Sequence, residues 1–211
     1  MPISVICISR TAFAGGETVG YLVAERLGKR YVDDEIIRLA AEKAKVDPEL
    51  VERAEHRVPL LERIVDVMGG PIQWSPPPEG YYAATMNALS RPTTEALRAL
   101  IRATIVEVAD RGDAVIVAHA ASFALSERTN VLRVLVTAPF ATRVERLAAM
   151  KMVEPKEAET IVRDSDRERQ AYLQRFYNVS EESPTHYDVV VNSERLVVEQ
   201  AVQVVISAAG R

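Results

Sequence analysis

The sequence predicts an α/β fold in which a parallel sheet is covered by helices on both faces. Short apolar runs rich in β-branched residues stand at 3–8, 114–118 and 131–136. Helical patterns of ten or more residues alternate with them, as is typical of parallel strands joined by crossover helices. Because these strands have no polar face, each is expected to be buried on both sides.

Local signals set the order of the elements. We expect strands at 3–8, 29–32, 114–118, 131–136 and 187–191. We expect helices at 19–27, 34–45, 93–111, 139–152, 155–177 and 196–208, and a turn-forming stretch at 9–16. Gly28 should end the first helix, because glycine adopts the left-handed C-cap conformation readily. Asp33 and Asp34 are expected N-caps of the second helix, and Asp47 before Pro48 predicts another helix start.

Length and composition indicate one globular domain over residues 1–211. The chain is long enough for one substantial core and too short for two ordinary ones. Hydrophobic residues make up 48% and charged residues 27% of it, which is the balance of a globular protein. The glycine- and proline-rich stretch at 69–80 is expected to be a loop inside this domain, because neither side of it holds a complete alternating pattern.

Charge and hydropathy exclude several classes of function. The net charge is −4 and the pI is about 5.5, whereas nucleic-acid-binding domains usually carry a basic excess. No apolar stretch approaches the roughly 20 residues that span a bilayer, and the N-terminus lacks the regions of a signal peptide. We therefore expect a cytoplasmic protein with neither nucleic acid nor membrane as partner. The single cysteine, Cys7, lies in an apolar run and is expected to be buried.

The stretch after the first strand has the composition of a phosphate-binding loop. It leads from a buried strand into a helix, whose N-terminal N–H groups and positive dipole end favour an anion. When residues 10–16 are aligned with the phosphate-loop pattern GxxxxGK[ST], Arg10 occupies the position of the first glycine and Gly15 that of the second. Gly16 occupies the position of the lysine. A glycine pair after a strand is also a common structural turn. Residues 118–120 and 137–139 follow two further strands and should lie at the same sheet edge.

The motifs, taken in order, resemble those of the cytidylate kinase-like family. The matching segments are ICISR, AGGETVGYLVAERLGKRYVDDEII, GDAVIV, NVLRV, AP with two following arginines, DRER and YDVVVN. They are spread over nearly the whole chain, and that family also has a glycine pair where cytidylate kinases have Gly-Lys. The resemblance implies a three-layer P-loop kinase fold with a five-stranded parallel sheet. It also implies an acceptor-binding insertion, here at 57–92, and a helical lid, here at 143–169.

The activity implied by this resemblance is phosphoryl transfer from ATP with Mg²⁺ to a nucleoside monophosphate, CMP or dCMP being the candidates. ATP would be bound by residues of the loop, namely Arg10, Thr11, Ala14, Gly15, Gly16, Glu17 and Thr18, with the Thr18 hydroxyl near Mg²⁺. The acceptor would be bound by Asp33, His119 and Arg163. Catalytic charge would come from Arg143, Arg146 and Arg169, with Asp166 one helical turn from Arg169 and able to hold it. A homo-oligomer is compatible with these assignments.

Other interpretations of the same residues stay open. The arginines at 143–169 have many acidic neighbours, as on a solvated helix surface. His119 stands where the family commonly has arginine, and Phe13 where it has glycine, which favours a non-catalytic nucleotide-binding module or a kinase for another small molecule. Arg10 is a candidate to replace the missing lysine. The aromatic side chains of Trp74, Tyr81 and Tyr82 either stack on a base or pin down their own loop.

Overall fold

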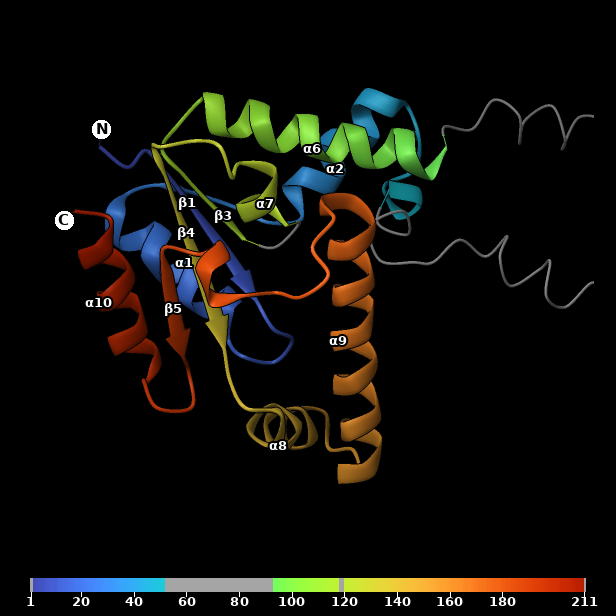
Figure 1. Ribbon diagram of the computed structural model, residues 1–211, viewed down its shortest axis with the longest axis vertical. Coiled ribbons are helices and arrows are strands. Elements are labelled where there is room, and N and C mark those ends of the chain that lie inside the picture. Colours follow the sequence, from blue (N-terminus) through green and yellow to red (C-terminus); the bar gives the residue numbers. More distant parts are fainter. Residues whose placement is uncertain (1, 52–92, 118–119, 211) are drawn as a thin grey trace, which may run out of the picture.

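In the computed structural model a five-stranded parallel sheet lies between two layers of helices (Figure 1). The structure describes residues 2–51, 93–117 and 120–210. The strands are β1 (Val5–Arg10), β2 (Arg30–Val32), β3 (Ala114–Val117), β4 (Val131–Thr137) and β5 (Val189–Asn192). Their order across the sheet is β2-β3-β1-β4-β5, with every pairing parallel. The parallel α/β fold expected from the sequence is therefore confirmed.

Helices cover the two faces of this sheet. One face packs against α1 (Gly16–Leu27) and α10 (Val198–Ala208), and the other against α2 (Glu35–Ala44), α6 (Thr94–Asp110) and the short α7 (Ala121–Ala124). Two further helices, α8 (Phe140–Lys151) and α9 (Pro155–Tyr177), pack against each other. Figure 1 shows α8 beyond the ends of the strands and α9 upright beside the sheet.

The central strand β1 shows how the core is divided. Val5 and Cys7 face the cluster that contains α2 and α6, whereas Ile6 and Ile8 face the cluster of α1 and α10. All four side chains are buried, because a central parallel strand has helices on both sides. Burial raises the pKa of the Cys7 thiol to about 12, so this cysteine is a packing residue, as expected.

Strand β1 also corrects the expected boundary of the phosphate loop. The sequence predicts a turn at Ser9 and Arg10, but the two residues continue the strand, paired in register with Leu135 and Val136 of β4. Two polar side chains at the end of an apolar run hide this extension from a sequence pattern. Helix α7 and the 3-10 turn η1 (Pro184–His186) were not expected, because three or four residues carry no periodicity.

The helix ends follow the expected capping residues in part. Gly28 ends α1 with φ 61°, and the Asp47 carboxylate accepts a hydrogen bond from the Glu49 amide at 2.9 Å, so both of these predictions are confirmed. Asp34 occupies the N-cap position of α2, but its side chain makes no capping hydrogen bond. The insertion at 57–92, with the loop at 69–80, lies outside the described residues. Within the described ranges, none of the helices combines the length and apolar character that crossing a membrane requires.

Candidate functional site

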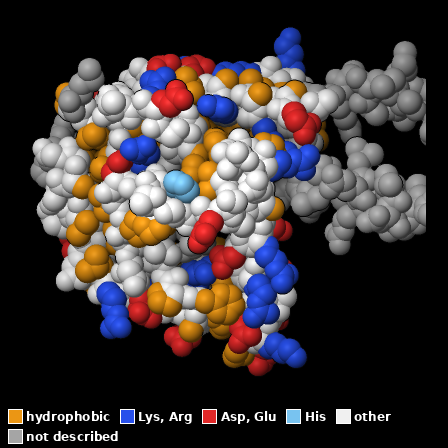
Figure 2. Space-filling view, viewed as in Figure 1, with side chains coloured by type: hydrophobic (Ala, Val, Ile, Leu, Met, Phe, Trp, Pro, Cys, Tyr) orange, Lys and Arg blue, Asp and Glu red, His pale blue; other side chains and the backbone are white. Residues whose placement is uncertain are grey.

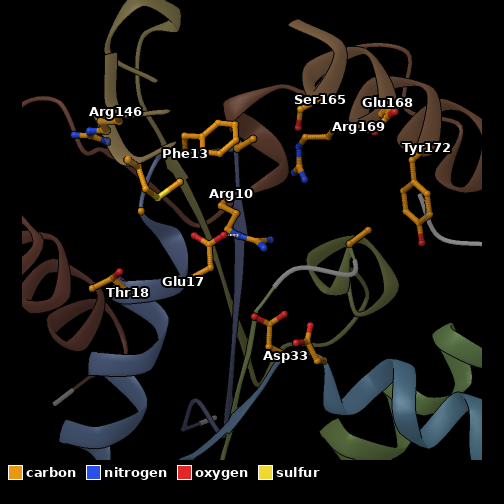
Figure 3. A pocket seen from close by; sticks show the side chains of 15 residues that line it. Arg10, Phe13, Glu17, Thr18, Asp33, Arg146, Ser165, Glu168, Arg169 and Tyr172 are labelled. Carbon is orange, nitrogen blue, oxygen red and sulfur yellow. Dashed lines mark ion pairs between the residues drawn. The ribbon is translucent and has the colours of Figure 1, made fainter. Parts of the chain in front are cut away.

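A cavity of about 700 Å³ lies at the carboxyl ends of β1 and β2, where α8 and α9 approach the sheet. Ligands of open α/β sheets bind at this edge. Figure 3 shows the side chains that converge on it from the loop after β1, the end of β2 and the two outer helices. The lining residues are Arg10, Ala12, Phe13, Gly15, Glu17, Thr18, Asp33, Asp34, Ala120, Arg146, Met150, Ser165, Glu168, Arg169 and Tyr172.

The loop between β1 and α1 forms one wall of this cavity. Its backbone is held by hydrogen bonds from the Thr11 amide to the Val136 carbonyl at 3.1 Å and from the Ala14 amide to the Thr11 carbonyl at 3.2 Å. Phe13 and Gly15 both have positive φ, 64° and 81°. A glycine takes that conformation without strain, whereas a phenylalanine takes it only when its surroundings hold it there.

Those surroundings are the apolar contact between α8 and α9. Phe13 packs against the cluster formed by Val144, Leu147, Ala158 and Val162. The ring therefore anchors the loop to the helical pair, and it contributes to the cavity wall without filling the cavity. Phe13 thus packs onto neighbouring apolar side chains.

The loop leads into the positive end of α1. Gly15 is the N-cap residue and has no side chain to cap the helix, so the first N–H groups of α1, at Gly16, Glu17 and Thr18, have no capping side chain from it. Gly15 and Thr18 both line the cavity. Aligned backbone dipoles and free N–H groups at such a terminus favour an anionic ligand.

Arg146 brings a positive charge to the same wall from α8. Its guanidinium donates to the Ser193 carbonyl at 2.7 Å and to the Ser193 hydroxyl at 2.9 Å, and more weakly to the Ala14 carbonyl at 3.4 Å. The Ser193 hydroxyl in turn donates to the Ala14 carbonyl at 2.7 Å. Arg146 is thus held by the residue after β5, Ser193, and it contacts the backbone of the loop after β1.

Arg169 reaches the cavity from α9, on the side opposite Thr18 (Figure 3). Its guanidinium binds both carboxylate oxygens of Glu182, at 2.8 and 2.6 Å, and lies 3.4 Å from the Tyr187 hydroxyl. Burial disfavours the charged form of Arg169, but the hydrogen bonds to Glu182 outweigh it, and the pKa is raised. Burial likewise opposes ionised Glu182, yet its bonds to Arg169 and Tyr187 lower its pKa.

Arg143 lies away from the cavity lining. Its side chain is buried and binds both oxygens of Asp166, each at 2.8 Å. The expectation that Asp166 holds Arg169 is therefore wrong, because the helix turns Asp166 toward α8 and leaves Arg169 to Glu182. Arg163 is exposed and stacks near the Phe140 ring at 5.7 Å. Figure 2 shows acidic and basic side chains together along α9, on the lower right of the view.

Acidic and aromatic side chains also line the cavity. Asp33 follows β2 and accepts a hydrogen bond from the Tyr31 hydroxyl at 3.1 Å. Burial, together with the nearby charge of Asp33, raises the pKa of Tyr31, so this phenol stays a donor at neutral pH. Asp34 follows Asp33 in the lining, and Tyr172 lines the cavity from α9, beside Glu168 and Arg169 (Figure 3). Carboxylates and an aromatic face in one cavity suit a ligand with hydroxyl or amino groups and a flat ring.

The structure thus brings together seven of the residues predicted from the sequence, which line one cavity: Arg10, Gly15, Glu17, Thr18, Asp33, Arg146 and Arg169. Thr11, Ala14 and Gly16 shape the loop behind it. His119 lies outside the described residues. Sequence reasoning missed Tyr172 and Glu168 in the lining, and it missed Glu182 and Ser193, which hold the two arginines. No local spacing signals these partners, since they belong to other elements.

A magnesium ion is implied by the resemblance, and the residues present fit one only in company with phosphate. Among the described residues no cluster of three or more histidine, cysteine or acidic side chains forms a metal site. The cavity does contain the Thr18 hydroxyl and the Asp33 carboxylate. Mg²⁺ commonly takes one or two protein oxygens and completes its shell with water and substrate phosphates, so the Thr18 hydroxyl by itself fits a metal that enters with a nucleotide.

Comparison with known proteins places this geometry in context. The model of the cytidylate kinase-like family matches residues 5–195. Among solved structures, an uncharacterized protein from Eubacterium ventriosum is similar, with a TM-score of 0.66 and 16% identity over 98% of both chains. Shikimate kinase from Bacteroides thetaiotaomicron has a TM-score of 0.53 and 14% identity over 100% of both chains. Shikimate kinase from Acinetobacter baumannii has a TM-score of 0.50 and 14% identity over 97% of this chain and 92% of that one.

At these identities the solved structures show the fold alone, and the chain shares the P-loop kinase fold with them. No curated protein matches the chain in sequence.

Proposed function

This chain belongs to the cytidylate kinase-like family, and from that premise we propose that it transfers a phosphoryl group from ATP to a nucleoside monophosphate, CMP or dCMP first among them. The observation that carries the proposal is that the loop after β1, Arg146, Arg169 and Asp33 line the same cavity at the ends of the strands. Phosphoryl transfer needs this combination, since catalysis is mainly positioning and stabilisation of charge on the moving group.

At the phosphate end, the backbone amides that begin α1 would bind the phosphate oxygens of ATP, with Gly15 leaving room for their approach. Arg146 would lie beside the phosphoryl group that is transferred. Hydrogen bonds to Ser193 already orient its guanidinium. When Mg²⁺ is bound, it neutralises part of the phosphate charge, and Thr18 would hold it there.

At the acceptor end, Asp33 and Tyr172 would bind the sugar and base of the acceptor. Arg169 would face the acceptor phosphate, held in place by Glu182. The segment at 143–169 would act as the lid: closure of α8 and α9 over the cavity would exclude water and bring Arg146 and Arg169 to the phosphates. The ion pair between Arg143 and Asp166 would keep α8 and α9 together while they close.

The direct test is a phosphotransfer assay with ATP and Mg²⁺ against all common nucleoside monophosphates, monitored by formation of ADP and of the diphosphate. Turnover with CMP or dCMP well above that with the purine monophosphates is expected. Folded protein that turns over none of them would refute the nucleoside monophosphate kinase.

Two observations favour other functions. Gly16 replaces the lysine of the usual loop, which favours a nucleotide-binding module without turnover; ATP would then raise Tm while no product forms. The carboxylates at the acceptor end, Asp33, Asp34 and Glu168, favour an alcohol without phosphate as acceptor, and shikimate kinase shares the fold. A screen of hydroxylated small molecules for ATP-dependent phosphorylation separates this third function from the first.

A further inference from the structure

The side chain of Arg10 occupies the space that a residue other than glycine would need at position 16. A Cβ atom added to Gly16 would lie 2.6 Å from Cβ of Arg10, and 3.1 and 3.4 Å from its Cδ and Cγ atoms. Real Cβ atoms essentially never approach one another below about 3 Å, and every residue except glycine carries a Cβ atom. A lysine at position 16 therefore requires either glycine at position 10 or a shift of the backbone. Gly16 itself has ordinary helical φ, so the loop does not need glycine there for backbone reasons.

We propose that Arg10 supplies the phosphate-binding cation that Gly16 cannot supply, so that R-x₄-G-G in this chain is a rearranged equivalent of G-x₄-G-K. The glycine and the basic residue have exchanged places between positions 10 and 16. The inference rests on the proposed function only in that the cavity must bind a polyphosphate; it does not depend on the acceptor or on turnover.

The position of Arg10 suits this role. It is the last residue of β1, and pairing with Val136 fixes its backbone beside the start of the loop. Its side chain is 25% exposed and lines the cavity. Figure 3 shows its guanidinium between the phosphate loop and Asp33, where the two ends of the cavity meet. A cation at that point faces the bond that phosphoryl transfer breaks and makes.

Glu17 holds Arg10 in the present state of the site. Nε of Arg10 forms an ion pair with the Glu17 carboxylate. Nε is buried, however, and makes no hydrogen bond with correct geometry to any residue the structure describes, so the pair relies on charge rather than on alignment. Glu17 is 47% exposed and stands in the first turn of α1, where a negative charge is favoured. If Arg10 binds a polyphosphate, the phosphate would replace the Glu17 carboxylate as its partner.

Binding of ATP and of inorganic tripolyphosphate to the full chain, measured by calorimetry with Mg²⁺, tests this assignment. Arg10→Ala should weaken both ligands about 10- to 100-fold, the factor that one charge-assisted hydrogen bond contributes. Glu17→Gln should tighten both, because it removes the competing carboxylate and leaves the arginine. Arg26→Ala is the matched control: this arginine pairs with Glu199 on the exposed side of α1 and should leave both affinities unchanged.

The decisive variant exchanges the residues at positions 10 and 16. Gly16→Lys alone should bind ATP and tripolyphosphate weakly, because Arg10 occupies the space of the new side chain. The double variant Arg10→Gly with Gly16→Lys should bind both ligands at least tenfold more tightly than Arg10→Ala. Circular dichroism and thermal unfolding establish that each variant is folded. If Gly16→Lys does not fold, Arg10→Ala and Glu17→Gln decide the matter by themselves.

Each outcome has one meaning for Arg10. Unchanged affinity in Arg10→Ala, or weaker binding in Glu17→Gln, would overturn the assignment while wild-type binding keeps the proposed function intact. Wild-type protein that binds tripolyphosphate through Arg10 but transfers no phosphoryl group would refute the kinase and retain the assignment. Wild-type protein that binds neither ligand would overturn both.

Discussion

The guanidinium of Arg143 on α8 and the carboxylate of Asp166 on α9 form a bidentate ion pair, with both hydrogen bonds at 2.8 Å. Arg143 is 5% exposed and also donates to the Ala138 carbonyl at 3.1 Å. The pair therefore joins the two helices near the loop after β1. If these helices close over the cavity, this contact makes them move as one body.

Asp166→Asn should destabilise the fold, because it leaves the buried charge of Arg143 without an ionised partner. Since Asp166 is 36% exposed on its side chain, water takes over part of the lost interaction, and we expect a loss of about 2 kcal/mol. Thermal unfolding should show Tm lower by about 5 °C. Asp164→Asn is the control: its pair with Arg167 is exposed on both sides and should change stability by less than about 0.5 kcal/mol. Equal effects of the two variants would contradict a structural role for Arg143.

Arg146→Ala should reduce kcat more than it raises KM for ATP. The guanidinium is held by Ser193 on the cavity wall, and removing one oriented donor from a transition state costs about 10²- to 10³-fold in kcat. Arg146→Lys should recover part of this loss, since it keeps the charge but not the planar fork. Steady-state kinetics measures both, with Arg167→Ala as the exposed control. A folded Arg146→Ala with wild-type kcat would remove Arg146 from the catalytic set.

Glu182→Gln should remove a pH dependence of stability. The folded pKa of Glu182 lies below its ordinary value of 4.5, because hydrogen bonds from Arg169 and Tyr187 outweigh burial. A carboxyl with a lowered folded pKa stabilises the protein above its unfolded pKa and loses that contribution as pH falls through the folded value. The Tm difference between wild type and variant should therefore be constant above about pH 5 and shrink in more acidic buffer.

The neighbouring Glu181, which is exposed, provides the control for this series. Glu181→Gln should leave the Tm profile of the wild type unchanged. A Tm difference between wild type and Glu182→Gln that stays the same down to strongly acidic pH would contradict the role of the Arg169–Glu182 pair.

Asp33→Asn should affect the acceptor and not the donor. Asp33 stands at the end of β2, across the cavity from Thr18 (Figure 3). Loss of its charge should raise KM for the acceptor about 10- to 100-fold, the contribution of a hydrogen bond to a charged group. The Kd for ATP should stay within about twofold of the wild type. Asp110→Asn, at an exposed pair with Arg128, is the control. A larger effect on ATP than on the acceptor would assign Asp33 to the metal or the phosphates.

Local sequence signals predicted the helices and strands well, because residues within each element determine where it forms and where it ends. Val5 to Ile8 are apolar without alternation, and they form a strand buried on both faces. Gly28 ends α1 where its backbone freedom is needed. The boundary errors, such as Arg10 continuing β1, arise where a polar side chain keeps to the strand register because β4 offers backbone partners.

What the sequence by itself determined is therefore the fold, the glycine loop at the start of α1 and the residue types that gather around it. Only the tertiary structure decided the pairing of the charges: Arg143 binds Asp166, Arg169 binds Glu182 and Arg10 binds Glu17. A long guanidinium side chain reaches several carboxylates that lie near it in sequence. For Arg143 and Arg169, the choice among them depends on how α8 and α9 pack against each other and against the sheet, and that packing results from many apolar contacts between distant segments.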